Sequence, residues 1–186
     1  MKEIIAETIK VLNSGGVILY PTDTIWGLGC DPNNSLAISS IYAIKQRSES
    51  KSMLVLVDSI EMLKNYVEFI PDVAYQLIEA STRPLTIIYP KAKNLAKNMI
   101  ASDGTIGVRV AKCAFCQQLI REYGKPIVST SANLGGKKPP LGFFDIENEI
   151  KMAVDYIVPL QLNELSTAKS SDIVKVFKNG QIEVIR

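Results

Sequence analysis

Apolar segments alternate with amphipathic ones along most of the chain, and this pattern predicts the elements of the fold. Ile5, Ile9 and Leu12 recur at helical spacing at the amino end, and two glycines follow, so a helix is expected over residues 1–14. The same spacing predicts helices over 35–47, 59–67, 71–80 and 114–124. Short apolar runs predict strands over 16–21, 53–58, 85–90, 105–110, 126–131, 156–160, 172–177 and 181–186.

The alternation of strands and helices predicts an α/β fold, a single domain over residues 1–186 with a twisted mixed sheet flanked by helices. The sequence Lys-Asn-Gly at 178–180 separates the last two strands and predicts a hairpin. A closing hairpin introduces an antiparallel pair, so the sheet is expected to be mixed rather than purely parallel.

Composition removes several classes of function. With 47% hydrophobic residues, the 186-residue chain can bury a substantial core, and its formal charge of +2 gives no argument for a polyanion-binding surface. Histidine is absent, which excludes a histidine metal site and a Ser-His-Asp triad. Base chemistry at neutral pH would therefore depend on carboxylates, lysines or the substrate itself.

The cysteines and the apolar runs indicate the compartment. Cys30, Cys113 and Cys116 are an odd set, and the amino end reads as a helix rather than a targeting segment, so a reducing cytoplasm is expected. Cys113 and Cys116 form a CxxC pair at the start of a predicted helix, where helix packing is favoured over thioredoxin-like redox chemistry. No apolar run approaches the roughly 18 residues that span a membrane.

Polar residues follow two predicted elements, where they could either bind a ligand or only complete the local structure. Thr22, Asp23 and Thr24 come directly after an apolar strand, where they could orient a polar ligand or merely complete a turn. Lys45 and Arg47 end a predicted helix, and Lys51 follows. These cations could cradle a polyphosphate if the helix uncoils near Arg47, although solvated cations at a helix end are the simpler interpretation.

Polar residues in or after two further strands favour a ligand. Ser129, Ser131 and Asn133 follow a buried strand and run into glycines, which favours close approach to phosphate or sugar over an ordinary polar loop. The Gly-, Pro- and Lys-rich segment 133–142 is expected to be a mobile loop. Arg109 lies inside an apolar strand, where its charge needs a buried partner or an anionic ligand.

Taken together, the stretches YPTDTIWGLGCD, KQR with Lys51, PLT, GVR, GKPIVSTSAN and SSDIVKV resemble the YrdC-like family of threonylcarbamoyl-AMP synthases. The resemblance runs from about Gly15 to residue 186. It implies a sheet with a basic concavity and an enzyme that makes threonylcarbamoyl-adenylate and pyrophosphate from L-threonine, bicarbonate and ATP with Mg²⁺. It also implies a partner complex that transfers the threonylcarbamoyl group to an adenosine beside the tRNA anticodon.

The resemblance also assigns roles to individual residues. Lys45 and Arg47 would be catalytic. It implies threonine contacts from Thr22, Arg109, Ser129 and Ser171. It implies ATP contacts from Lys45, Arg47, Lys51, Thr105, Ser131, Asn133 and Lys178.

The sequence departs from the family pattern at several places. Ser48 and Arg83 replace a proline and a glycine, Gly135 stands where a serine is frequent, and Val55 stands where some members have a histidine. The competing interpretations are a non-catalytic module that binds tRNA or double-stranded RNA, and a carbamoyl-transferring domain of the hydrogenase-maturation type. The low net charge and the scarcity of interleaved aromatic and basic residues favour the enzyme over the RNA-binding module.

Overall fold

The structure is a computed structural model that describes residues 1–48, 53–159 and 169–186. Its strands are β1 Ile18–Tyr20, β2 Gly27–Gly29, β3 Leu54–Val57, β4 Leu85–Tyr89, β5 Ile106–Val110, β6 Ile127–Ser131, β7 Tyr156–Ile157, β8 Asp172–Val176 and β9 Ile182–Val184. Its helices are α1 Lys2–Asn13, α2 Ser35–Ile44, α3 Ile60–Leu63, α4 Asp72–Ala80, α5 Ala114–Tyr123 and α6 Asn148–Ala153, with 3₁₀ turns η1 Lys97–Met99 and η2 Phe143–Asp145.

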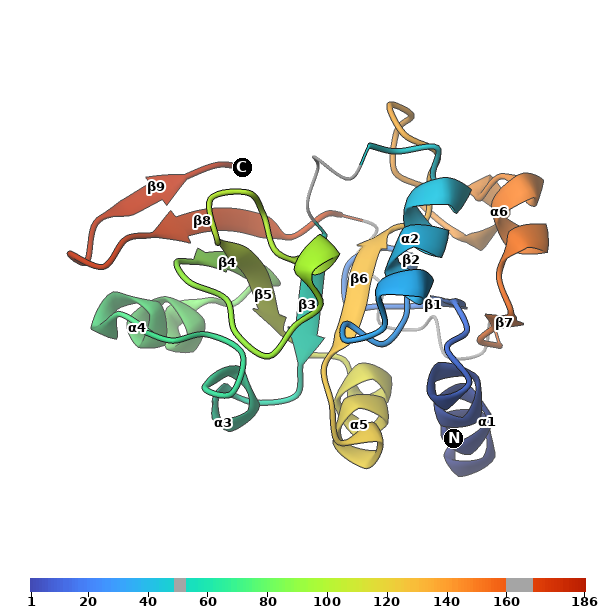
Figure 1. Ribbon diagram of the computed structural model, residues 1–186, viewed down its shortest axis with the longest axis horizontal. Coiled ribbons are helices and arrows are strands. Elements are labelled where there is room, and N and C mark those ends of the chain that lie inside the picture. The colour runs from blue at the N-terminus through green and yellow to red at the C-terminus, as the bar shows by residue number, and fades with distance from the viewer. Residues whose placement is uncertain (49–52, 160–168) are drawn as a thin grey trace.

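The strands of the described residues form one nine-stranded sheet in the order β7-β1-β2-β6-β3-β5-β4-β8-β9 (Figure 1). Three pairs, β1–β7, β3–β5 and β4–β8, are parallel, and the other neighbours are antiparallel. The predicted α/β class with a mixed sheet is therefore confirmed, and so is the hairpin of β8 and β9.

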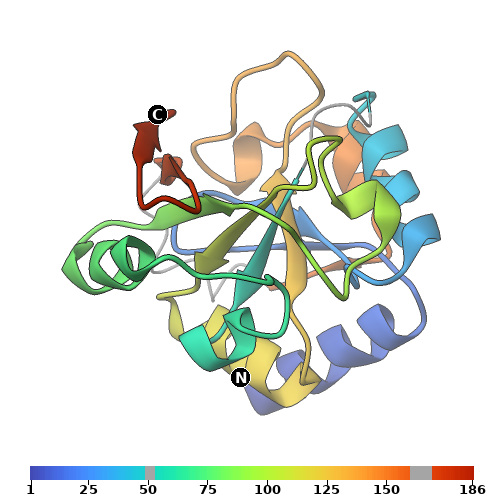
Figure 2. The ribbon, with the colours of Figure 1, turned by 60° about the vertical axis from the view of Figure 1, so that its left-hand side comes forward.

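Each face of the sheet carries its own hydrophobic core, because successive side chains of a strand point to opposite sides. Leu56 belongs to the core that α1 and α5 cover, whereas Val55 and Val57 belong to the core under α2. Helices α1 and α5 lie side by side along one end of the sheet, and α2 and α6 lie near each other at its β7 side (Figures 1 and 2). The α1–α5 pair covers only part of its face.

Some expected elements are shorter than predicted or were missed. The helix expected over 59–67 is reduced to α3, and of the strand expected over 156–160 the described residues form only β7, with residue 160 outside them. Strand β2 was not predicted because two of its three residues are glycines, which are depleted in strands. Gly29 is nonetheless required there, since a Cβ at this position would lie 2.7 Å from Tyr20 Cε1 and 2.8 Å from Val128 O.

The helix expected over 35–47 ends at Ile44, and this has a consequence for the cations that follow it. Gln46 takes a φ of 49°, in the left-handed region, so the backbone leaves the helical path between Lys45 and Arg47. The uncoiling that the polyphosphate interpretation requires is thus present. None of the helices in the described ranges is long and apolar enough to cross a membrane.

Candidate functional site

The open part of the sheet, beyond α1 and α5, carries polar residues where a covered face would carry apolar ones. Strand register places Ser129, Leu54, Gly107 and Ile88 in one row across β6, β3, β5 and β4. The next row on the same face contains Ile127, Leu56, Arg109 and Thr86, and its β6 and β3 members lie under α5. The α1–α5 core and the polar site therefore share one face of the sheet.

A cavity of about 260 Å³ opens over these rows. Its lining includes hydroxyl side chains from several elements, among them Thr24, Thr105, Ser129 and Ser171. Three arginines also line it, Arg47, Arg109 and Arg186, whereas the described lining residues include no carboxylate. This combination of hydroxyls and guanidinium groups suits a polar, anionic ligand.

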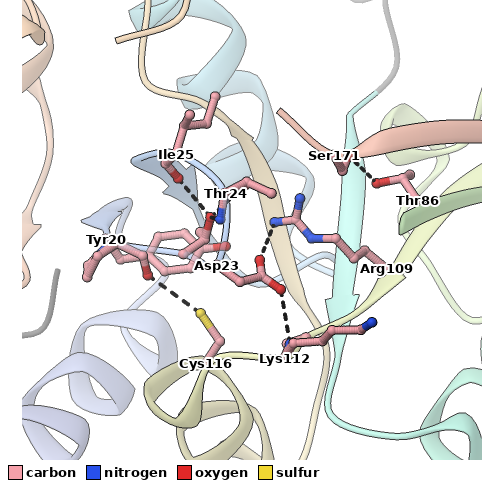
Figure 3. Close-up of polar contacts among 12 residues, drawn as sticks. Tyr20, Asp23, Thr24, Ile25, Thr86, Arg109, Lys112, Cys116 and Ser171 are labelled. Atoms are coloured by element: carbon pink, nitrogen blue, oxygen red, sulfur yellow. Dashed lines mark hydrogen bonds and ion pairs between the residues drawn. The ribbon is translucent and has the colours of Figure 1, made fainter. Parts of the chain in front are cut away.

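Arg109 forms the buried ion pair that its strand setting required. Its Nη2 lies 3.3 Å from Oδ1 of Asp23, and the exposed fractions of the two side chains are only 4% and 7%. Asp23 Oδ2 also accepts a hydrogen bond of 3.0 Å from the backbone N–H of Lys112. Figure 3 shows the Asp23 carboxylate between Arg109 and Lys112. This ion pair holds the Arg109 guanidinium at the cavity. The Arg109 Nε has no hydrogen-bond partner among the described residues.

Thr22 and Thr24 have different positions relative to the cavity. The Thr22 hydroxyl lies 2.8 Å from Ile25 O, to which it donates, and 2.8 Å from the Thr24 hydroxyl. It also accepts a 3.1 Å bond from the Thr24 backbone N–H. Thr22 is therefore occupied in holding the loop and is not part of the cavity lining, whereas Thr24 is. A direct contact of Thr22 with threonine stays a prediction. Of the loop hydroxyls that the sequence offered for a ligand, Thr24 is the one that lines the cavity, although the resemblance assigned the threonine contact to Thr22.

The carboxyl-terminal hairpin contributes Ser171 and Arg186 to the cavity. Ser171 is buried, and its hydroxyl lies 2.8 Å from that of Thr86 (Figure 3). Arg186 donates from Nε and Nη2 to the Ser171 carbonyl at 3.2 and 3.1 Å. Lys178 lies in the exposed turn between β8 and β9, outside the lining of the cavity. Of the two cations, Arg186 lines the cavity and Lys178 does not, and an ATP contact of Lys178 stays a prediction.

A second cavity of about 270 Å³ lies at the ends of α2 and β6. Its lining includes Lys45, Arg47, Ser131 and Asn133, and Arg47 and Ser131 line the first cavity as well. Asn133 Oδ1 is buried and has no hydrogen-bond partner among the described residues. The cations after α2 and the polar end of β6 are far apart in the sequence. In the structure they lie together where the two cavities adjoin. Lys51 lies outside the described residues.

Lys45 is held inside this arrangement and is only 1% exposed. Its Nζ donates to the carbonyl of Ser131 and, at 2.7 Å, to that of Asn133. Gly135 N–H in turn donates to the Lys45 carbonyl at 2.6 Å. The side chain thus links the end of α2 to the segment after β6. Burial, aided by the Arg47 charge and opposed by Glu147, lowers the pKa of Lys45 to about 8.

The pKa of Lys45 predicts a specific pH dependence of stability. An unfolded chain keeps the ordinary pKa of 10.5, so between pH 8 and 10.5 it binds more protons than the folded protein. Unfolding free energy should therefore rise with pH in this window by up to about 1 kcal/mol per pH unit, relative to Lys45→Met. Urea denaturation of both proteins at several pH values measures this difference. If the unfolding free energies of the two proteins changed equally with pH, the prediction would be wrong.

The cysteines support the packing interpretation. Cys113 and Cys116 are free and buried in the core that α1 and α5 cover, and Cys30 is buried under α2. The Cys116 thiol lies 3.5 Å from the Pro21 carbonyl, to which it donates. This contact attaches α5 to the strand that leads into the Thr22–Thr24 loop.

The fold and the two adjoining cavities define a class, an α/β domain whose mixed sheet carries cavities lined by hydroxyl and guanidinium groups. A family model described as "Telomere recombination", that of the Sua5/YciO/YrdC proteins, matches residues 10–186. The chain belongs to this family. A threonylcarbamoyl-AMP synthase from Pseudoalteromonas translucida (strain TAC 125) is 38% identical over 180 residues, which cover 94% of this chain and 96% of that protein.

Solved structures have the same fold. E. coli YciO matches with a TM-score of 0.84 and 24% identity, over 100% of this chain and 89% of that one. P. abyssi Sua5 complexed with L-threonine matches with a TM-score of 0.84 and 22% identity over 92% of this chain, which spans only 50% of that chain. Full-length HypF, in its phosphate- and nucleotide-bound form, matches at 0.81 and 23% identity, over 98% of this chain and 28% of that one. Identities this low show the fold alone.

Proposed function

We propose that the protein is a threonylcarbamoyl-AMP synthase, which converts L-threonine, bicarbonate and ATP into threonylcarbamoyl-AMP and pyrophosphate. The 38% identity to a synthase over nearly the full length of both chains is the observation that supports this most directly. The site is consistent with it, because two adjoining cavities that share Arg47 and Ser131 could hold an amino acid and a nucleotide next to each other.

In this proposal the first cavity holds threonine. Arg109 would pair with the carboxylate, and its buried tie to Asp23 keeps the guanidinium in place without filling all of its donors. Hydroxyls of Ser129, Ser171 and Thr24 would surround the substrate. The nucleotide would be contacted by Arg47, Thr105, Ser131, Asn133 and Arg186. Lys45 would hold the carbonyls of Ser131 and Asn133 in place.

The reaction needs positioning more than a protein base. The threonine amine attacks bicarbonate and gives a carbamate with loss of water, and a carbamate oxygen then attacks the α-phosphorus of ATP as pyrophosphate leaves. Such a step depends on in-line placement and on neutralising phosphate charge, which the arginines would supply. The described lining residues of the two cavities include no carboxylate, so in this proposal Mg²⁺ would arrive bound to ATP oxygens rather than to these side chains.

The cellular setting belongs to the same proposal. The product would pass in the cytoplasm to a transferase complex that modifies an adenosine next to the tRNA anticodon. Direct binding of tRNA or double-stranded RNA is the alternative function, and the net charge of +2 gives it little electrostatic support. The carbamoyl-transferring domain remains the other alternative, to which only a likeness of fold points.

The proposal is tested by incubating the purified protein with ATP, labelled bicarbonate and threonine. Pyrophosphate release and incorporation of label into a nucleotide product should both depend on threonine. Release that is independent of threonine would reject the synthase. A non-catalytic RNA-binding module would give no turnover, together with RNA affinity that falls steeply as salt rises.

A further inference from the structure

Trp26 carries a buried hydrogen-bond donor that the described protein does not satisfy. The side chain is 1% exposed, and its Nε1–H has no partner among the described residues. A buried donor left unpaired is costly, and most buried polar groups in proteins have a partner. Trp26 also lines the first cavity, so a ligand there can provide the missing acceptor.

Strand register places the Trp26 side chain on the α2 side of the sheet, opposite Ser129, and Trp26 lines the cavity together with Arg47, which follows α2. The Trp26 carbonyl accepts a 2.9 Å hydrogen bond from Ala132, and two residues later Leu28 pairs with Thr130. Side chains two residues apart in a strand share a side, so Trp26 and Thr130 lie on the same side of the β2–β6 ladder. Arg47 Nη1 is 3.3 Å from the Thr130 hydroxyl. Trp26, Thr130 and Arg47 all line the cavity.

The indole is held rigidly, which suits a group that orients a ligand. Its ring packs against Phe143 at 5.0 Å between centroids and an interplanar angle of 58°. Lys151 Nζ lies 4.7 Å from the Phe143 centroid and covers that ring in turn. A donor fixed by aromatic packing loses little conformational freedom when it binds an acceptor.

We propose that Trp26 Nε1–H donates a hydrogen bond to a phosphate oxygen of the bound nucleotide, beside Arg47. An indole N–H and a guanidinium at one end of a cavity whose described lining residues include no carboxylate match an anionic oxygen, which could accept from both. The inference rests on the proposed function, to which it adds a substrate-positioning residue. A tryptophan that only fills the core would leave its N–H without an acceptor among the described residues.

The chain contains one tryptophan, which permits a direct test. ¹⁵N-indole labelling gives a single N–H resonance, and ATP added without threonine or bicarbonate should move it downfield. Replacing the tryptophan biosynthetically with β-(3-benzothienyl)alanine exchanges N–H for sulfur in a ring of nearly the same size. We expect ATP to bind about tenfold more weakly to that protein, the loss of one hydrogen bond to a charged acceptor.

Trp26→Phe is the genetic counterpart, and Phe143→Leu is the matched control, because it changes the packing of the indole while keeping the N–H. Phe143→Leu should keep ATP affinity within about threefold. An unmoved resonance, or equal ATP affinity with and without the N–H, would overturn the inference and leave water as the partner. If neither ATP nor threonine raises the melting temperature of the unlabelled protein, the proposed function itself fails.

Discussion

Asp23→Asn is expected to destabilise the protein by about 3–5 kcal/mol, because it leaves the buried Arg109 without its counter-charge. Arg109→Met should cost a similar amount, since it leaves the buried Asp23 carboxylate without the positive charge of Arg109. Urea denaturation gives the free energy of unfolding of each variant. The double variant should be less destabilised than the sum of the two, because the stranded partner is removed as well.

The exposed ion pair of Arg83 and Asp172 supplies the control. Its N–O separation of 3.2 Å is close to the 3.3 Å of the buried pair, but the two side chains are 62% and 40% exposed. Arg83→Met should therefore cost less than about 1 kcal/mol. If the Arg83 and Arg109 variants lost the same free energy of unfolding, burial would not explain the contribution of the Asp23–Arg109 pair to stability.

The same variants separate structure from substrate binding. At temperatures where it is folded, Asp23→Asn keeps a cation at the cavity, so threonine affinity should fall less than in Arg109→Met, which removes it. Measuring the threonine dependence of pyrophosphate release for both variants makes this comparison. Equal losses would mean that Arg109 acts only by supporting the loop.

Much of the site could be predicted from the sequence because its pieces lie at strand ends. The polar end of β6, the charged residue inside β5 and the cations after α2 are each recognisable from their neighbours along the chain. Sequence reasoning left open whether Arg109 meets a buried partner or a ligand. The structure shows that Asp23 is the partner, a contact across the sheet that no local pattern contains.

The differences at Thr22 and Arg186 have a common physical reason. In the loop after β1, Thr22 and Thr24 are chemically alike, and only the folded structure shows that Thr24, and not Thr22, lines the cavity. In the hairpin, Lys178 and Arg186 are both cations, and the turn geometry decides which returns to the cavity. Spacing along a sequence does not determine where a hairpin brings its second strand back.

Arg186 is accordingly the residue for which we expect the largest effect on nucleotide use within the hairpin. Its backbone pairs with Ile173, through N–H to Ile173 O at 3.2 Å and Ile173 N–H to its own carbonyl at 2.9 Å, so the side chain starts from a fixed point. It forms none of the ion pairs found among the described residues, which leaves its charge available for an anion. Arg186→Gln should weaken ATP binding about ten- to hundredfold, as expected for one charge-assisted contact.

Lys178→Gln is the comparison that distinguishes the structural assignment from the resemblance. An exposed lysine in the β8–β9 turn should change ATP affinity less than twofold, and that residual effect should vanish at 0.5 M salt because it reflects screened long-range attraction. Arg186 is exposed too, so salt should weaken its contact, but the loss in Arg186→Gln should stay larger than that in Lys178→Gln at the same salt, because Arg186 lines the cavity and Lys178 does not. Calorimetric titration with ATP at low and high salt measures the affinity of both variants. A larger loss of ATP affinity in Lys178→Gln than in Arg186→Gln would show that Lys178 contacts the nucleotide.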